Sequence, residues 1–556
     1  MARFSQLVAF LACTASIAAR KPTLEERGIP KDPTGVRTIT SPQGAKISFK
    51  QPGKEGICET KEGVDDYAGY ISLDNTTNMF FWFFEARENP TEKPLTLWLN
   101  GGPGSDSLIG LFQEHGPCNV TEDLKTQWNP YSWNEHSNML YLSQPVGVGF
   151  SYETTKTDAN GRYHYANPNK TNTTDAAAIG AWHVLQAFLD LSPQLDPDIT
   201  NFTFNLWTES YGGHYGPAFY NYFYQQNEGI RNGSIEGVEL RMDTLGIING
   251  IVDEEIQAPY YPEFAVNNTY GIKSIEDNVY SNMKLAYTKP NGCHDQLLAC
   301  KSSPRTSAAD FNICAQATSY CRSNVEEPYY FYGDRGVYDI RHPYNDPTPP
   351  DHFSDFLNLA ETQQALGVNI NYTNGGYGEQ VGQGFAATGD FVWPNFIDDL
   401  QDILSYGVRV ALVYGDADYI CNWFGGEAVS LAVNHTNKAA FAAAGYAPVV
   451  VGGVEVGEVR EFGNFSFTRV YEAGHEIPYY QPRASLEIFK RVLLHVVIAD
   501  GSRVVTGDYA TNGTAEATHT EPFVPLPSST RSSGGSLATG EGTGVPVLLA
   551  GKTGGS

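Results

Sequence analysis

The feature that most constrains the fold is an alternation of short apolar runs with longer segments of helical periodicity. The runs at residues 95–99, 139–142 and 202–207 have the length and composition of buried strands. Residues 175–191, between the second and third runs, repeat apolar side chains at helical spacing. Because parallel strands need long crossover connections, this alternation predicts a mostly parallel sheet flanked by helices on both faces, an α/β architecture.

The alternation is interrupted in the middle of the chain. Further strands and a last helix follow the same pattern, at residues 245–251, 408–414, 465–471 and 482–497. Between about 256 and 385 the pattern lapses, and Pro, Tyr, four cysteines and loop-like composition dominate. We therefore expect one α/β domain, made of residues 56–255 and 386–523, with residues 256–385 inserted as a cap subdomain.

The two ends of the chain differ from the rest. Residues 1–19 hold Arg3, a short apolar run and then small residues, which is the order of a cleaved secretory signal rather than of a short buried helix. Residues 20–55 are polar and rich in Pro, Gly and Lys, and fit either an N-terminal arm or a propeptide. Residues 524–556 are rich in Ser and Gly and predict a flexible tail.

Length and charge limit the function classes. The 556 residues carry 36 Lys and Arg against 63 Asp and Glu, a formal charge of −27. Nucleic-acid binding needs clustered basic residues, and the sequence has no basic run, so nucleic acids are poor candidate partners. After the first residues no stretch has the ~18 consecutive apolar residues of a membrane span. At ~150 residues per domain the length fits three or four domains, or equally one large α/β domain with an insertion.

The density of glycosylation signals also favours secretion to the cell exterior. Asn-x-Ser/Thr sites are typical of chains that pass through the secretory pathway. Such sites begin at Asn75, Asn119, Asn169, Asn172, Asn201, Asn232, Asn267, Asn371, Asn434, Asn464 and Asn512.

The cysteines predict disulfides. With Cys13 removed in the signal, seven remain, so one thiol is left over. Four of them have symmetric spacings of six, thirteen and six residues, which suggest nested pairs, Cys293 with Cys321 and Cys300 with Cys314. Zinc is the alternative, but the short Cys-x₂₋₄-Cys knuckles of structural zinc sites are absent. By elimination, the third pair is Cys58 with Cys118, and Cys421 is the free thiol.

One strand end has the sequence of a nucleophile elbow. The run at 202–207 leads through Glu209 to Ser210, two glycines and a helical pattern. A sharp turn between strand and helix lifts a serine hydroxyl above the sheet and places backbone N–H groups at a helix N-terminus. Thr208 replaces the first glycine of the usual Gly-x-Ser-x-Gly pattern. Ser210 is therefore a candidate nucleophile.

The two late strands end in suitable partners for a serine. The strand at 408–414 is followed by Asp416 and Asp418, and the strand at 465–471 by His475. Active sites of open α/β sheets gather at the carboxyl ends of strands. A serine needs a base, and the base needs an orienting carboxylate, in the chain order Ser, Asp, His of α/β-hydrolases. Local sequence does not decide between the two aspartates.

Four dispersed motifs together resemble the serine carboxypeptidases (peptidase family S10), most closely the fungal carboxypeptidase S1 group. They are Asn100-Gly-Gly-Pro-Gly104, Glu209-Ser-Tyr-Gly-Gly213, Gly415-Asp-Ala-Asp-Tyr-Ile-Cys-Asn-Trp423 and Ala473-Gly-His475. The resemblance extends over roughly residues 60 to 500 and implies an α/β-hydrolase fold. It implies Ser210 as nucleophile, His475 as general base and acid, and Asp418 as its orienter.

The resemblance also implies the rest of the machinery. Backbone N–H groups of Gly102 and Tyr211 would form the oxyanion hole. Asn100, Glu114 and Glu209 would bind the carboxylate of the substrate's C-terminus. Because two carboxyl groups facing a carboxylate repel it unless they are protonated, we expect activity to favour acidic pH.

The leaving-residue pocket departs from the family pattern. Glu476 follows His475, where many members have Met, and we expect it to favour Lys or Arg as the released residue through charge pairing. Cys421 matches a free cysteine near the same pocket. The sequence has neither a His-Glu-x-x-His nor a Gly-x₄-Gly-Lys-Ser/Thr motif, so we expect no metal and no cofactor.

The sequence thus predicts a secreted carboxypeptidase that releases single residues from peptides and proteins through an acyl-enzyme. Two alternatives stay open. An esterase or acyltransferase would use the same triad, and a non-catalytic binding protein would keep only the fold.

Overall fold

The computed structural model describes residues 30–40, 44–154, 157, 166–167, 170–196, 199, 201–374 and 377–526. The expected signal at 1–19 and residues 527–556 of the expected tail lie outside these ranges, as does Asn169. In the described part, no helix is both long enough and apolar enough to cross a membrane.

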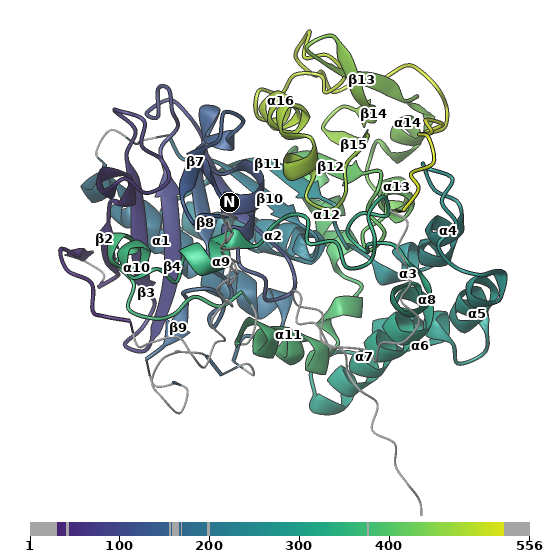
Figure 1. Cartoon of the computed structure of the whole chain (residues 1–556), viewed down its shortest axis with the longest axis horizontal. Helices are drawn as coiled ribbons and strands as arrows, with labels where there is room; N and C mark the ends of the chain where they lie inside the picture. Colours follow the sequence, from purple (N-terminus) through teal and green to yellow (C-terminus); the bar gives the residue numbers. More distant parts are fainter. Residues whose placement is uncertain are drawn as a thin grey trace, which may run out of the picture.

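One large mixed sheet organises the molecule (Figure 1). Its hydrogen-bonded path runs through β1 (Arg37–Thr40), β2 (Lys46–Lys50), β3 (Asp66–Ser72), β4 (Thr77–Phe84), β8 (Asn138–Leu142), β5 (Leu95–Leu99), β10 (Thr203–Glu209), β11 (Arg241–Ile248), β12 (Arg409–Gly415), β15 (Phe465–Val470), β14 (Val454–Phe462) and β13 (Ala447–Val451). The pairs from β8 to β15 are parallel, and the strands on either side are antiparallel. The short β9 (Tyr152–Glu153) joins β4, and β6 (Cys118–Val120) pairs separately with β7 (Thr126–Trp128).

Both faces of the central strands are buried, which explains their unbroken apolar runs. In β5, Leu97 and Leu99 belong to one hydrophobic core and Trp98 to the other, because successive side chains of a strand point to opposite faces. α1 (Thr174–Leu195), α2 (Gly212–Arg231) and α12 (Phe396–Ser405) contribute to the first core, and α16 (Pro482–Leu493) to the second. Ile179, which the helical pattern of α1 included, is 44% exposed.

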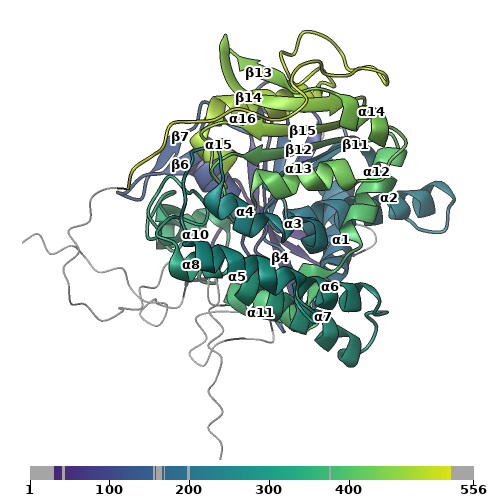
Figure 2. The same cartoon turned by 90° about the vertical axis from the view of Figure 1, so that its right-hand side faces the viewer.

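The segment between β11 and β12 is largely helical, where the sequence suggested loops. It contains α3 (Glu254–Gln257), α4 (Tyr260–Val266), α5 (Asp277–Thr288), α6 (Cys293–Lys301), α7 (Ala308–Cys321), α8 (Pro328–Tyr332), α9 (His352–Phe356), α10 (Ala360–Leu366) and α11 (Tyr377–Thr388), followed by α12. Figure 2 shows α5, α6 and α7 as a layer on one side of the molecule. Disulfides Cys293–Cys321 and Cys300–Cys314 tie α6 to α7, and a third joins Cys58 to Cys118. These are the pairs expected from the sequence.

Three further segments complete the body. Strands β1 (37–40) and β2 (46–50) of the sheet come from the expected arm or propeptide. α13 (Trp423–Ala432) and α14 (Lys438–Ala443) lie between β12 and β13, and α15 (Ile477–Tyr480) lies between β15 and α16. The last described residues contact both the sheet and the segment between β11 and β12. Arg469 of β15 donates to His519 O, and Arg335 of that segment donates to Val524 O, each at 2.8 Å.

Candidate active site

Ser210 lies in a strained turn between β10 and α2. Its φ of 63° is in the left-handed region that non-glycine residues rarely adopt. Two backbone hydrogen bonds hold the turn: Ser210 N donates to Ile248 O at 3.0 Å, and Ile251 N donates to Ser210 O at 2.9 Å. A Cβ on Gly213 would lie 2.2 Å from Ile251 O, so the close approach needs glycine there. The geometry is that of a nucleophile elbow.

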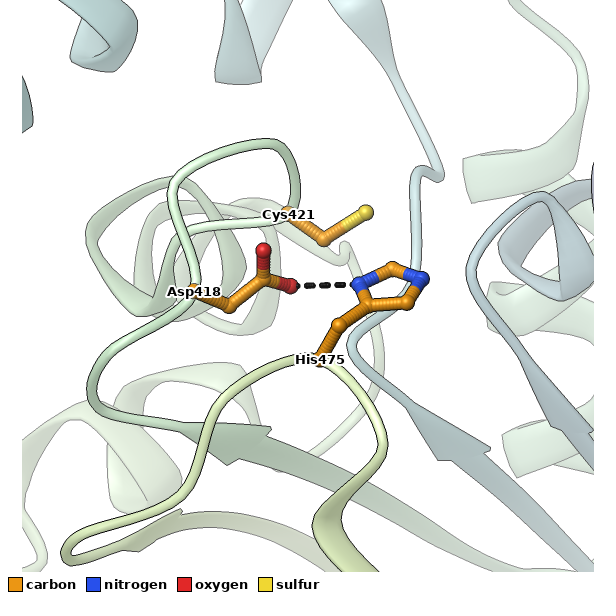
Figure 3. A group of neighbouring side chains, drawn as sticks. All are labelled: Asp418, Cys421 and His475. Atoms are coloured by element: carbon orange, nitrogen blue, oxygen red, sulfur yellow. Dashed lines mark hydrogen bonds and ion pairs between the residues drawn. The ribbon is translucent and has the colours of Figure 1, made fainter. Parts of the chain in front are cut away.

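His475 and Asp418 form a buried pair beside this turn (Figure 3). His475 Nδ1 and Asp418 Oδ2 are 2.7 Å apart, and Asn249 Nδ2 donates to the same oxygen at 2.6 Å. Asp418 is fully buried and His475 is 6% exposed. The aspartate therefore fixes the orientation of the imidazole and leaves Nε2 free for a proton transfer.

The structure separates the two candidate aspartates. Asp416 accepts from Tyr270 OH at 2.7 Å and lies 3.9 Å from an Arg469 nitrogen, and Asp418 alone contacts the histidine. β10, β12 and β15, which carry the serine, the aspartate and the histidine, lie close together in the sheet with parallel carboxyl ends. In the described residues Ser210 and His475 share no hydrogen bond; such bonds are often long before substrate binds.

The turn at Asn100–Gly104 packs directly against the residue after the serine. A Cβ on Gly101 would lie 2.3 Å from Tyr211 N, and Gly102 has a φ of 106° that favours glycine. Tyr211 is held in place because its hydroxyl donates to Asp390 Oδ2 at 2.5 Å. The backbones of Gly102 and Tyr211 therefore lie close together in the site.

Asn100, Glu114 and Glu209 form a buried cluster next to that turn. Asn100 Nδ2 donates to Glu114 Oε1 at 3.2 Å and to Glu209 Oε1 at 3.1 Å. The amide orientation is fixed because Asn100 Oδ1 accepts from Trp98 Nε1 and Gly110 N. The second oxygen of each glutamate is buried without a hydrogen-bond partner.

Burial changes the protonation of these glutamates. Desolvation raises the pKa of Glu114 from 4.5 to about 7. Desolvation and the nearby Glu114 raise the pKa of Glu209 well above its ordinary value. The cluster therefore carries protons in mildly acidic solution and can donate hydrogen bonds to an anion.

Glu476 and Cys421 border the same site. Desolvation, Glu114 and Asp351 raise the pKa of Glu476 well above its ordinary value, and Glu476 contributes in turn to the raised pKa of Glu209. Cys421 is a buried free thiol. One ligand atom each from Asp418, Cys421 and His475 lies within 4.8 Å of the others (Figure 3), so a soft cation would have to break the Asp418–His475 hydrogen bond to bind there.

Comparison with known proteins identifies the family. The family model of serine carboxypeptidases matches residues 52–495. The chain belongs to the serine carboxypeptidase family. It is 43% identical over 548 residues to carboxypeptidase S1 homolog A of Arthroderma otae, covering 88% of this chain and 83% of that protein. It is 42% identical over 442 residues to carboxypeptidase S1 of Penicillium janthinellum, covering 79% and 97%.

The fold agrees with the family. The crystal structure of a prohormone-processing carboxypeptidase from Saccharomyces cerevisiae superposes with a TM-score of 0.65 at 22% identity, covering 85% of this chain and all of that one. The present chain therefore has the α/β-hydrolase fold. As a member of the serine carboxypeptidase family, it is a hydrolase of peptide bonds.

Sequence reasoning did not assign Asn249 or Trp98 to the site. Asn249 contacts Asp418, and Trp98 orients Asn100. The signal was present for Asn249, which directly follows a strand at the edge where active-site residues gather. Trp98 sits inside a strand, and nothing in the sequence separates it from an ordinary core residue.

Proposed function

We propose that the protein is a secreted serine carboxypeptidase that releases single C-terminal residues through an acyl-enzyme and works best in acidic solution. The observation that carries the proposal is the Asn100–Glu114–Glu209 cluster beside the Asp418–His475 pair and Ser210. A plain esterase would have no use for a buried, protonated cluster that recognises a free carboxylate.

The proposed chemistry uses each residue in one role. His475 Nε2 takes the proton of Ser210 as Oγ attacks the scissile carbonyl carbon, and Asp418 stabilises the resulting imidazolium. The carbonyl oxygen becomes an oxyanion that accepts from Gly102 N–H and Tyr211 N–H. Collapse breaks the peptide bond, and His475 returns the proton to the leaving amine. Water then hydrolyses the Ser210 ester by the same steps.

Recognition of the free carboxylate gives the direction of the pH dependence. A substrate α-carboxyl ionises at about 3.5, whereas Glu114 loses its proton at about 7. Between these values the cluster is protonated and the substrate is an anion, so hydrogen bonds form. As the pH rises through about 7, Glu114 becomes negative and repels the substrate carboxylate.

We propose Glu476 as the group that selects the released residue. It follows His475 directly and its charge reaches the carboxylate cluster, so it borders the leaving side of the site. A released Lys or Arg would pair with it, because the added positive charge favours ionised Glu476 and opposes the burial that raises its pKa. If Glu476→Gln leaves the ratio of rates for released Lys and released Leu unchanged, this role is wrong.

Secretion is supported by the sequence of residues 1–19, the glycosylation signals and the three disulfides, which persist in oxidising compartments.

One experiment tests the function. An N-blocked dipeptide and its C-terminal amide are incubated with the enzyme, with and without a serine-directed phosphonylating reagent. We expect release from the free acid only, abolished by the reagent. Preferential turnover of an ester would support an esterase or acyltransferase, and absence of turnover would support a binding protein.

A further inference from the structure

A buried carboxyl in the segment between β11 and β12 contacts the residue that follows the serine. Asp390 begins a short 3₁₀ helix (Asp390–Val392) and is fully buried. Its Oδ2 accepts from the hydroxyls of Tyr211 and Thr174, each at 2.5 Å, and its Oδ1 accepts from Thr174 N at 3.0 Å. Because Thr174 is the first residue of α1, this one carboxyl joins the start of α1 to the nucleophile elbow.

The residue after Asp390 contacts the same elbow. Phe391 O lies 3.0 Å from His214 Nε2, and the other ring nitrogen of His214 lies 2.6 Å from Ile251 O. Ile251 is also the residue whose N–H donates to Ser210 O. The start of α2 is therefore tied to residues 390–391 twice, through the side chains of Tyr211 and His214.

Tyr211 is constrained at both its ends. Its side chain is fully buried and its ring stacks on His214, with ring centres 4.3 Å apart and 26° between the planes. Its hydroxyl, the one polar atom of the side chain, donates to Asp390. Its backbone N faces the Asn100–Gly104 turn, since a Cβ on Gly101 would lie 2.3 Å from it. A shift of the side chain would therefore move the N–H relative to that turn.

The direction of this N–H matters for the proposed reaction. It is one of the two donors that would stabilise the oxyanion, and loss of one such donor typically lowers kcat by about 10²–10³-fold. A misplacement of about 1 Å can cost ~10²-fold in rate. The neighbouring Ser210 has a φ of 63°, and such a backbone persists only when its surroundings hold it. The contacts that hold Tyr211 therefore bear on the rate.

We infer that Asp390 is a positioning residue for the reaction: by accepting from the Tyr211 hydroxyl, it fixes the backbone N–H of Tyr211 in the oxyanion hole. This rests on the proposed carboxypeptidase function. Asp390 acts through Tyr211 and not on the substrate. The oxyanion hole then depends on the segment between β11 and β12 as well as on the turn at 100–104.

The test breaks the hydrogen bond from each side. Tyr211→Phe removes only the hydroxyl and keeps the backbone N–H, and Asp390→Ala removes the acceptor. We expect each to lower kcat for an N-blocked dipeptide by about 10- to 10²-fold with little change in KM, because the oxyanion develops only in the transition state. Tyr211→Phe added to Asp390→Ala should cause no further loss, since both substitutions break the same hydrogen bond.

Two further variants distinguish positioning from packing. Tyr220→Phe is the matched control, since Tyr220 is a fully buried tyrosine of α2 whose hydroxyl has no hydrogen-bond partner among the described residues, and its kcat should equal that of wild type. Asp390→Asn can still form a hydrogen bond with the Tyr211 hydroxyl and should retain more activity than Asp390→Ala. Losses that multiply in the double variant, or wild-type kcat in Tyr211→Phe, would overturn the inference.

A second measurement does not depend on peptide hydrolysis. A fluorophosphonate is attacked at phosphorus by Ser210 Oγ and loses fluoride, and its phosphonyl oxygen takes the place of the oxyanion. We expect the rate constant of this reaction to fall in Tyr211→Phe and Asp390→Ala by about the same factor as kcat. An unchanged rate constant in both would contradict the positioning role. If wild type reacts with the fluorophosphonate but does not cleave the dipeptide, the carboxypeptidase function is wrong, whereas the phosphonylation rates of the variants still test Asp390.

Discussion

At the scale of single residues, the side chains of the site fix one another's orientation through hydrogen bonds. Asn249 uses both ends of its amide, donating to Asp418 Oδ2 and accepting from Gly415 N at 2.9 Å. It thereby ties the end of β11 to the loop that carries the aspartate. Because an error of about 1 Å in a catalytic group can cost ~10²-fold in rate, such a residue matters without touching substrate.

We expect Asn249→Ala to lower kcat by about 10- to 10²-fold while KM changes little, because the aspartate loses one of its two constraints. Steady-state kinetics with an N-blocked dipeptide checks this. Asn232→Ala, at an exposed helix end, is the control. Unchanged kcat in a folded Asn249→Ala enzyme would show that the histidine alone orients Asp418.

The carboxylate cluster predicts a specific pH profile. Since burial raises the pKa of Glu114 to about 7, KM for an N-blocked dipeptide acid should rise as the pH increases through 7, while KM for an ester lacking the free carboxylate should not. Glu114→Gln, which stays neutral at every pH, should show a flatter profile. A KM that stays constant from pH 5 to pH 9 would show that a protonated cluster does not bind the substrate carboxylate.

At the scale of elements, different interactions stabilise the central sheet and the helical segment between β11 and β12. The sheet is stabilised by buried apolar faces, whereas α6 and α7 are joined by Cys293–Cys321 and Cys300–Cys314. In α6 only Leu297 and the two cysteines are buried, so this helix has little apolar surface to anchor it.

We expect the double substitution Cys300→Ser with Cys314→Ser to destabilise the protein by about 3 kcal/mol, the loss expected for a loop of this size. The two cysteines are 14 residues apart. Removing Cys58–Cys118, which closes a 60-residue separation, should cost somewhat more. Denaturant unfolding of the purified variants measures both; equal stability to wild type would contradict the expectation.

The sequence predicted the central strands accurately and missed several helices. β5 was predicted to the residue, and β10, β12 and β15 to within about two residues, because each is a buried strand with an unbroken apolar run. The helices between β11 and β12 were missed because in α6 and α7 disulfides replace an apolar stripe, and a helix without a stripe has no periodic signal. Likewise, α16 ends at Leu493, four residues earlier than expected.

At the scale of the whole molecule, buried acids couple folding to pH. Burial raises the pKa of Asp66, Asp390 and Asp399 to about 7 and that of Glu85 to about 8. Between about pH 4 and pH 8 the folded protein therefore binds more protons than the unfolded chain. By linkage, its stability falls as the pH rises through this range.

We expect the thermal unfolding temperature to be higher at pH 5 than at pH 8, measured at constant ionic strength. Asp66→Asn removes the titration of this group and should reduce this difference. Its single amide oxygen can accept from Trp82 or from Gly53, so one of the two hydrogen bonds of Asp66 is lost at every pH. A protein that is equally stable or more stable at pH 8 would show that these carboxyls are ionised in the folded state.

The exposure of each asparagine predicts which glycosylation signals carry a glycan. Asn75, Asn232, Asn267, Asn434 and Asn512 are exposed. Asn371 is 4% exposed, and Asn464 Nδ2 donates to Val408 O at 2.8 Å, so a glycan on either would disrupt the fold. We expect mass spectrometry of the protein, purified from a host that glycosylates asparagine, to find glycans in the first set and none on Asn371 or Asn464. A glycan on Asn371 would contradict the burial of that residue.

The sequence by itself indicated the sheet, the candidate serine and histidine and the nested cysteine pairs, because strand periodicity, a nucleophile elbow, residues at strand ends and symmetric spacing are local signals. Local sequence did not separate Asp416 from Asp418, since both follow the same strand. The resemblance to serine carboxypeptidases implied Asp418, and in the tertiary structure Asp418, not Asp416, contacts His475. Tertiary structure also decided that Glu254 and Glu326 are buried with carboxyl oxygens that lack hydrogen-bond partners within the described residues. Burial and hydrogen bonding depend on which distant segments meet, and no local pattern records that.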